Sequence, residues 1–458
     1  MPPPPKQILL NAFTMNCVGH INHGLWTHPR DRSADYNTLG YWTEQAKLLE
    51  RGLFDGIFIA DIIGVYDIYG GGIDVTARES VQLPVNDPMM LVSAMAAVTE
   101  NLGFGITVNV HNEAPYTFAR RISTLDHLTR GRVGWNIVTG YLDSAHRGRG
   151  DTALPAHDRR YEYAEEYLEV LYKFWEGSWE EGAARRDRAA RVFADPARIH
   201  RVVHHGEFLD VEGYHLAEPS PQRTPVLYQA GTSGRGRAFA GRHAECVFIS
   251  ARDKATARAS VRAIREEAAR CGRRPEDVKV FVGIAVIPGA TRAEAEDKRD
   301  EYLAHASPEA GLAHFSASTG IDFARYGLDE PIPYGPTNAI QSASEAAARR
   351  GLTKRDLLAE LALGGRYAAI VGDPVTVADE LRSWVEEGEV DGFNLSRLVV
   401  PESYADFIDL VIPELQDRGL YKTAYGEGSL RRKLFGAHDL LPPRHAGATF
   451  RRAKETVA

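Results

Sequence analysis

Short apolar runs alternate with longer amphipathic stretches along most of this 458-residue chain. The amphipathic stretches predict α-helices. In the stretch 38–51, Leu39, Trp42, Ala46 and Leu49 recur along one helix face, and Gly52 follows as a stop signal. Asp87 and Pro88 open another helix, as an N-cap followed by proline does. Helices are predicted at 38–51, 87–99, 115–128, 158–175, 254–270, 375–387 and 403–418, with one more after residue 234.

The apolar runs between these helices predict buried β-strands. The run from Trp135 to Val138 is the clearest, because it ends abruptly in the small and polar residues Thr139, Gly140 and Tyr141. Eight strands are predicted, at 8–13, 55–61, 104–110, 132–139, 225–230, 246–250, 278–287 and 393–399.

Eight strands that alternate with helices predict an α/β protein with a parallel sheet. Eight repeats fit a closed (β/α)8 TIM barrel with insertions better than an open doubly wound sheet. The open sheet would carry a glycine-rich dinucleotide fingerprint after its first strand, and the sequence has none there.

The whole chain, 1–458, is therefore interpreted as a single barrel domain with long additions. Three segments are too long for simple connections and are predicted insertions, at about 62–85, 176–223 and 305–366. The last is rich in Gly, Ser, Pro and Ala and is interpreted as a lid. Residues 420–458 form a C-terminal extension, whose basic cluster 431–433 is expected to be solvated.

Composition narrows the function classes. A net charge of -8 gives no support for binding nucleic acid or an anionic membrane. No apolar run has transmembrane length, and the first five residues lack the features of a signal peptide. Cys17, Cys246 and Cys271 show no metal or disulfide spacing, which favours a reducing cytoplasm.

In a TIM barrel the chemistry lies at the C-terminal strand ends. The ends predicted here are rich in hydrogen-bonding groups and poor in carboxylates. The turn 231–236 joins a strand to a helix and is rich in glycine, so its backbone N–H groups could hold a phosphate. A tight turn without a ligand is the alternative. The helix start at His157 could supply further phosphate donors, or be a solvated cap.

His20 and His23 raise the possibility of a metal site. Their spacing is wrong for a helical pair, and the last predicted strand ends in Leu395, Ser396 and Arg397 without a ligand. No metal is therefore predicted. Cys17 taken alone is read as a small buried residue rather than a nucleophile.

Several stretches together resemble a known family. They are 11–20 with 24–26, 52–61, 81–88, 123–128, 229–233, 391–394 and 430–436, and they span nearly the whole chain. The chain resembles the bacterial luciferase-like flavin monooxygenases, in the branch of the nitrilotriacetate, dibenzothiophene sulfone and long-chain alkane monooxygenases. The alkane monooxygenase shows the strongest resemblance.

The resemblance implies a two-component, FMN-dependent monooxygenase. A separate NAD(P)H:flavin reductase supplies reduced FMN, and O2 forms a flavin C4a-hydroperoxide that oxygenates a small hydrophobic substrate. Long-chain alkanes and halogenated or heteroaromatic compounds are candidate substrates. The resemblance also implies a homodimer or a dimer of dimers, for which the helices after the second and third strands are the expected interface.

The resemblance assigns roles to individual residues. The positions near the isoalloxazine or ribityl chain are Phe13, Met15, Ala60, Asp61, Gln82, Thr139 and Gly140. Those near the phosphate are Arg160, Tyr161, Ala230, Gly231 and Ser233. Catalytic candidates on the substrate side are Cys17, His20, Tyr66, Gln82, Tyr141 and His314.

Two strand ends depart from the family pattern. The fourth strand typically ends in Thr-Ser, followed by His in the alkane enzyme, where this chain has Thr139, Gly140 and Tyr141. The third strand is followed by His111 and Asn112, where paired threonines are usual in the family. The flavin chemistry is thus expected to transfer better than the substrate. A deazaflavin-dependent oxidoreductase of the same superfamily and a non-catalytic flavin-binding barrel stay open as alternatives.

Overall fold

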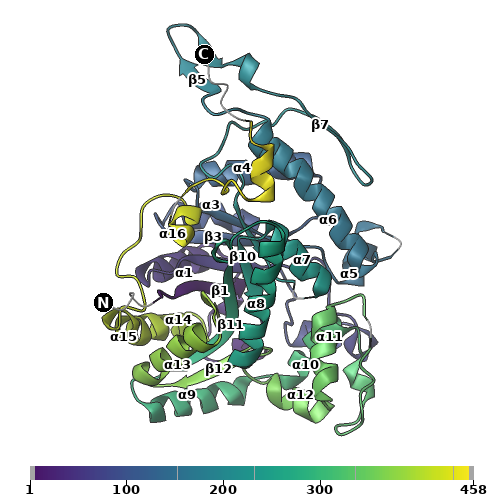
Figure 1. Ribbon diagram of the computed structural model, residues 1–458. Coiled ribbons are helices and arrows are strands. Elements are labelled where there is room, and N and C mark those ends of the chain that lie inside the picture. Colours follow the sequence, from purple (N-terminus) through teal and green to yellow (C-terminus); the bar gives the residue numbers. More distant parts are fainter. Residues whose placement is uncertain (1–5, 152, 232, 336, 437, 453–458) are drawn as a thin grey trace.

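Parallel strands close into a barrel at the centre of the molecule (Figure 1). The computed structural model describes residues 6–151, 153–231, 233–335, 337–436 and 438–452, so the first five residues, the last six and Thr232 of the predicted turn lie outside it. Strand β13 connects β1 to β11, because it pairs with both. The pairing of β11 with β10 then closes the sheet. The barrel strands are β1 (Leu9–Met15), β2 (Gly56–Ala60), β3 (Gly103–Asn109), β4 (Val133–Val138), β9 (Val226–Gln229), β10 (Cys246–Ile249), β11 (Lys279–Pro288) and β13 (Gly392–Ser396). The predicted (β/α)8 barrel and all eight of its strands are confirmed.

Helices surround this barrel (Figure 1). Side-chain caps fix several starts: Thr38, Asp253 and Asp373 each accept a backbone N–H from the first turn of their helix. The prediction that Gly52 ends the first helix is confirmed, but the left-handed residue there is Leu53, with φ 57°. The helices are α1 (Leu39–Arg51), α3 (Met89–Ala96), α4 (Pro115–Leu128), α5 (Asp143–Arg149), α6 (His157–Tyr172), α7 (Gly234–His243), α8 (Lys254–Arg270), α9 (Arg292–His305), α13 (Pro374–Glu387), α14 (Glu402–Asp406) and α15 (Ile412–Asp417).

Strand β4 shows how alternation divides the barrel wall. Trp135 points outward, where its ring lies 4.7 Å from that of Phe118 on α4. Asn136 points inward, donates a hydrogen bond to Thr107 on β3 (2.9 Å), and lines a cavity at the barrel mouth. One strand therefore supplies both the core and the site.

The insertions contain more regular structure than the sequence predicted. Residues 62–85 include the short helix α2 (Asp74–Arg78). Residues 176–223 form two hairpins, β5 (Ala184–Asp187) with β6 (Val192–Ala194) and β7 (Val202–His205) with β8 (Asp210–Gly213), that extend away from the barrel (Figure 1). The predicted lid region contains α10 (Pro308–Thr319), α11 (Gln341–Arg350) and α12 (Lys354–Glu360).

The sequence analysis missed a ninth parallel strand, β12 (Ala368–Gly372). It pairs with the far end of β11, where Ile284–Pro288 extends beyond the barrel. The run is only five residues long and three of these residues are partly or fully exposed, so its apolar signal is weak.

The expectation of a solvated basic cluster is wrong for Arg431. This residue lies on α16 (Leu430–Phe435), is 2% exposed, and forms an ion pair with Glu245 (2.6 Å) just before β10. The C-terminal extension is therefore bonded into the base of the barrel. In the described part of the chain, no helix is long and apolar enough to cross a membrane.

Candidate active site

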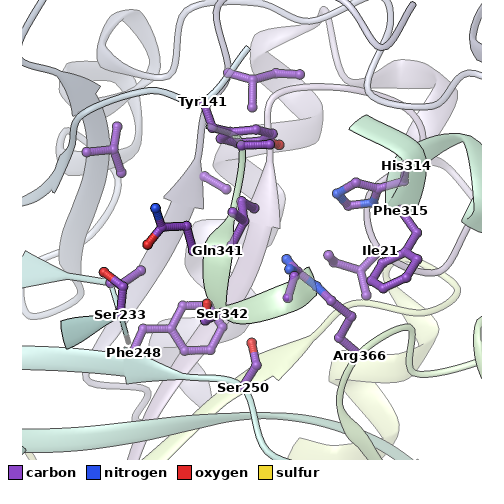
Figure 2. Close-up of a pocket in the computed structure, with 18 of the residues that line it drawn as sticks. Ile21, Tyr141, Ser233, Phe248, Ser250, His314, Phe315, Gln341, Ser342 and Arg366 are labelled. Atoms are coloured by element: carbon purple, nitrogen blue, oxygen red, sulfur yellow. The ribbon is translucent and has the colours of Figure 1, made fainter. Parts of the chain in front are cut away.

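A cavity of about 730 Å³ opens at the C-terminal ends of the barrel strands (Figure 2). Its walls come from the strand ends and from the inserted helices α10, α11 and α12. The cavity brings together all but one of the candidate site residues, namely Phe13, Met15, His20, Ala60, Asp61, Tyr66, Gln82, Thr139, Gly140, Tyr141, Arg160, Tyr161, Ala230, Gly231, Ser233 and His314.

One end of the cavity has the donors that a phosphate needs. Ser233 caps helix α7, and its hydroxyl accepts the backbone N–H of Gly236 (3.1 Å), so the positive end of the helix dipole faces the cavity. The ring Nε2 of His157 lies 3.3 Å from the same hydroxyl. Arg160 is 2% exposed; it donates to the carbonyls of Pro155 (2.7 Å) and Asn338 (2.8 Å), and its buried Nε has no partner.

Two glycines in the cavity wall are closely covered by neighbouring side chains. A Cβ at Gly231 would clash with Nε2 of Gln229 (2.3 Å) and with the hydroxyl of Tyr161 (2.5 Å). Gly140 has φ +75°, and a Cβ there would lie 2.5 Å from Nδ2 of Asn109. Glycine at both positions lets these polar side chains pack directly against the main chain.

The opposite end carries a hydrogen-bonded cluster. The hydroxyl of Tyr66 donates its one proton to Oε1 of Gln82 (2.6 Å). The hydroxyl of Tyr141 lies 3.0 Å from that of Tyr66 and is therefore the donor in this second bond. His314 from α10 stacks on the Tyr66 ring, with centroids 5.0 Å apart, and its Nδ1 lies 3.1 Å from Nε2 of His23. Figure 2 shows Tyr141 and His314 across the cavity from Ser233.

Burial keeps this cluster uncharged. Burial and nearby Arg397 lower the pKa of His23 to about 3, and the pKa values of His20 and His314 also fall well below their ordinary range for the same first reason. Burial raises the pKa of Tyr66 and Tyr141. The imidazoles and phenols are therefore neutral near pH 7.

Asp61 at the end of β2 behaves differently from an ordinary carboxylate. Burial, and next the charge of Asp87, raise its pKa to about 8. The group is largely protonated at neutral pH and can donate a hydrogen bond.

Cys17 is the candidate that the cavity does not include. It is fully buried, its thiol donates to the carbonyl of Gly19 (3.1 Å), and burial raises its pKa to about 12. Such a thiol is neither ionised nor accessible. His111 also lies off the cavity wall and stacks on Tyr163, with ring centroids 4.4 Å apart.

The sequence analysis missed several cavity residues. Ser250 follows β10, and the strand-end rule applied to the sixth strand would have found it. The others come from the loop after β1, from the inserted helices α10 and α11, and from the turn before β12, none of which the sequence pattern placed at the site: Ile21, Phe315, Gln341, Ser342 and Arg366. Among the residues described, no group of three or more His, Cys, Asp or Glu side chains is arranged to hold a metal ion.

Known proteins resemble this chain over its whole length. A dimethyl-sulfide monooxygenase from Hyphomicrobium sulfonivorans is 48% identical, covering 99% of this chain and 96% of the relative. A long-chain alkane monooxygenase from Geobacillus thermodenitrificans is also 48% identical, over 99% of this chain and all of the relative.

Solved structures agree. A crystal structure of long-chain alkane monooxygenase superposes with a TM-score of 0.92 at 47% identity, covering 97% of this chain and 100% of the other. A riboflavin lyase, solved with modified FMN and riboflavin, gives 0.93 at 37% identity, covering 98% and 100%. The sequence model of the family described as luciferase-like monooxygenase matches residues 20–391. The chain belongs to the luciferase-like monooxygenase family.

Proposed function

We propose that this protein is the oxygenase of a two-component, FMN-dependent monooxygenase that acts on a small, largely apolar molecule. A separate NAD(P)H:flavin reductase supplies the reduced FMN. The observation that carries the proposal is a single cavity at the mouth of the barrel, with the capped start of α7 and Arg160 at one end and neutral hydrogen-bonding side chains at the other.

The phosphate end fits FMN. The capped start of α7 and the buried guanidinium of Arg160, whose Nε lacks a partner, favour an anion. The absence of a side chain at Gly231 lets the hydroxyl of Tyr161 lie close to this turn. Ser233, Tyr161 and Arg160 would hold the phosphate.

The remaining cavity fits the rest of the cofactor. Phe13, Met15 and Ala60 offer apolar contact, while Thr139 and Gly140 offer the polar end of β4. When bound, reduced FMN would supply the activation of oxygen.

The protein itself binds, orients and excludes water. Tyr66 and Gln82 would present hydrogen bonds to the ligands without a net charge. Apolar residues of the inserted helices, among them Phe315, Leu357 and Leu361, cover this space and limit the entry of water.

The names of the relatives support this substrate class. Dimethyl sulfide, long-chain alkanes and dibenzothiophene sulfone are small and mostly apolar, and they are named for relatives 48%, 48% and 39% identical to this chain. Monooxygenation of such a molecule fits a cavity whose wall is more apolar than polar.

The test is anaerobic titration with reduced FMN, followed by rapid mixing with oxygen. We expect reduced FMN to bind more tightly than oxidised FMN, and its reoxidation to be slower than that of free reduced FMN. Binding no tighter than to an unrelated protein would contradict the proposal. Preference for a deazaflavin in the same titration would favour the oxidoreductase alternative, and binding without any change in oxygen reactivity would favour a non-catalytic barrel.

A matched pair of variants tests the position of the phosphate. Gly231→Ala would crowd the Tyr161 hydroxyl, whereas an added Cβ at Gly234 of the same turn meets nothing within 4 Å. We expect FMN affinity to fall at least about tenfold, about 1.4 kcal/mol, in Gly231→Ala and to change little in Gly234→Ala. Equal affinities in the two variants would show that the phosphate lies elsewhere.

A further inference from the structure

The side chain of Arg366 enters the cavity without a carboxylate partner among the described residues. Other arginines of the wall are engaged. Arg252 and Arg350 pair with Glu360, and Arg349 pairs with Glu345. The guanidinium of Arg366 is half-buried and hydrogen bonds with the phenol of Tyr367, whose raised pKa keeps it neutral. No negative charge among the described residues pairs with the guanidinium, so it offers a place for an anion in the cavity.

Arg366 lies at the substrate end rather than the phosphate end. Its charge acts on Tyr66, Tyr141 and His314, whereas the charges that act on Tyr161 are those of Arg160 and Arg235. Figure 2 shows the side chain of Arg366 extending into the middle of the cavity, towards Ser342 and Gln341. An anion bound there would be distinct from the phosphate of FMN.

The backbone that carries Arg366 is held firmly in place. The amide of Gly364 donates to Oδ1 of Asn22 (2.7 Å), and Asn22 is itself bonded to the carbonyl of Arg397 (2.7 Å). Arg252 donates to the carbonyl of Gly365 on one side of Arg366. Tyr367, on the other side, is 3% exposed. The guanidinium thus projects from a preorganised turn, which lowers the entropy cost of binding a ligand.

The surroundings leave the charge uncompensated. The neighbouring imidazoles His20 and His314 are buried and neutral. The carboxylates of the nearby wall are occupied: Asp253 accepts the amide of Thr256 (2.8 Å) at the start of α8, and Glu360 binds Arg350 and Arg252.

We propose that Arg366 is a specificity-determining residue that pairs with an anionic group of the substrate. The substrate class is then an organic acid, with a carboxylate at Arg366 and an apolar body that extends towards Tyr66 and Tyr141. A planar guanidinium matches a carboxylate with two parallel hydrogen bonds. This inference rests on the proposed function, whose flavin it leaves at the other end of the cavity.

The test compares octanoate with octanamide, which have the same length and shape but differ in charge, by calorimetric titration of the protein saturated with FMN. We expect octanoate to bind at least tenfold more tightly. Arg366→Gln should abolish that difference and Arg366→Lys should retain part of it, while FMN affinity stays within twofold of the wild type.

Arg349→Gln is the matched control, because it removes an exposed arginine of the same wall that has a carboxylate partner. It should leave the preference for octanoate unchanged. Equal binding of octanoate and octanamide by the wild type would overturn the inference, as would an equal loss in Arg349→Gln or a fall in FMN affinity in Arg366→Gln. If FMN itself fails to bind, the proposed function fails, and the same pair titrated against the chain alone still decides whether Arg366 selects an anion.

Discussion

Burial sets the charge of the individual side chains in the cavity. The imidazole of His314 and the phenol of Tyr66 stay neutral because each is removed from water, and each has a neutral hydrogen-bond partner, His23 for His314 and Gln82 for Tyr66. Neutral side chains at this end suit a site that must avoid competing acid–base reactions beside a reactive cofactor.

Asp61 provides a prediction at this scale. Its pKa of about 8 means that Asp61→Asn replaces a largely protonated carboxyl with a neutral group of the same shape. We expect FMN affinity at pH 7 to stay within about twofold. Above pH 8 the wild type should bind FMN more weakly, because the ionised carboxylate adds negative charge beside an anionic ligand, and the variant should not. Titrations at pH 7 and pH 9 check this; an equal pH dependence in the two proteins would contradict it.

Tyr141 provides a second prediction. Tyr141→Phe removes one hydrogen bond to Tyr66 and leaves the bond from Tyr66 to Gln82, whereas Tyr66→Phe removes both. One such bond contributes about 1 kcal/mol, so we expect the reoxidation rate of bound reduced FMN to change by about threefold to tenfold in Tyr141→Phe and by more in Tyr66→Phe. Rapid-mixing absorbance measures both. A larger effect of Tyr141→Phe would mean that its hydroxyl acts independently of Tyr66.

At the scale of elements, segments distant in sequence lock one another in place. Arg431 of α16 bonds to the carboxylate of Glu245 and to the carbonyls of Thr224 and Pro225, just before β9. The backbone amide of Leu227 also donates to Glu245 (3.0 Å). The C-terminal extension thereby completes the buried polar network beneath two barrel strands.

Arg431→Met should strongly destabilise the protein, because it leaves the carboxylate of Glu245 buried and unpaired. We expect a loss of about 3–5 kcal/mol in the free energy of unfolding, measured by chemical denaturation. Arg432→Met is the matched control: Arg432 pairs with Asp439 at the surface (2.8 Å), and its loss should cost less than about 1 kcal/mol. Similar costs for the two variants would contradict the role of the buried pair. Adding Glu245→Gln to Arg431→Met should recover part of the loss.

At the scale of the whole molecule, buried histidines couple stability to pH. Burial lowers the pKa of His23 to about 3 and those of His111 and His215 to about 4, all below the ordinary value of 6.5. The unfolded chain therefore binds more protons than the folded one below pH 6.5, so stability falls as the pH falls towards 4. His20 and His314 act in the same direction, whereas Asp61 acts in the opposite direction, since its folded pKa is raised.

We expect the free energy of unfolding to decrease between pH 6.5 and pH 4.5, by up to about 1.4 kcal/mol per pH unit for each such histidine. Denaturant titrations at pH 7.5, 6 and 5 measure it. His23→Gln should reduce the slope by about one such increment. A slope that is unchanged in that variant would show that His23 is not a source of the coupling.

The sequence by itself determined the barrel and most of the residues at its mouth. Periodicity depends on which face of a local element meets the core, so eight strands and their helices could be predicted from short windows, and strand ends such as Thr139 and Gly140 marked the site. The resemblance to a family gave Tyr66, Gln82 and His314 a common place, which the strand pattern alone did not.

Only the tertiary structure decided what depends on contacts across the chain. It showed the buried pairing of Arg431, the displacement of Cys17 from the cavity, and the projection of Arg366 into it. The burial of Cys17 confirms what its residue type alone predicted and corrects the role that the resemblance implied. The placements of Arg431 and Arg366 have no local signal, because they are set by partners far away in the sequence. The insertions carry little periodicity, so the sequence did not predict the helices of the lid or strand β12. The structure shows them, with β12 paired to β11.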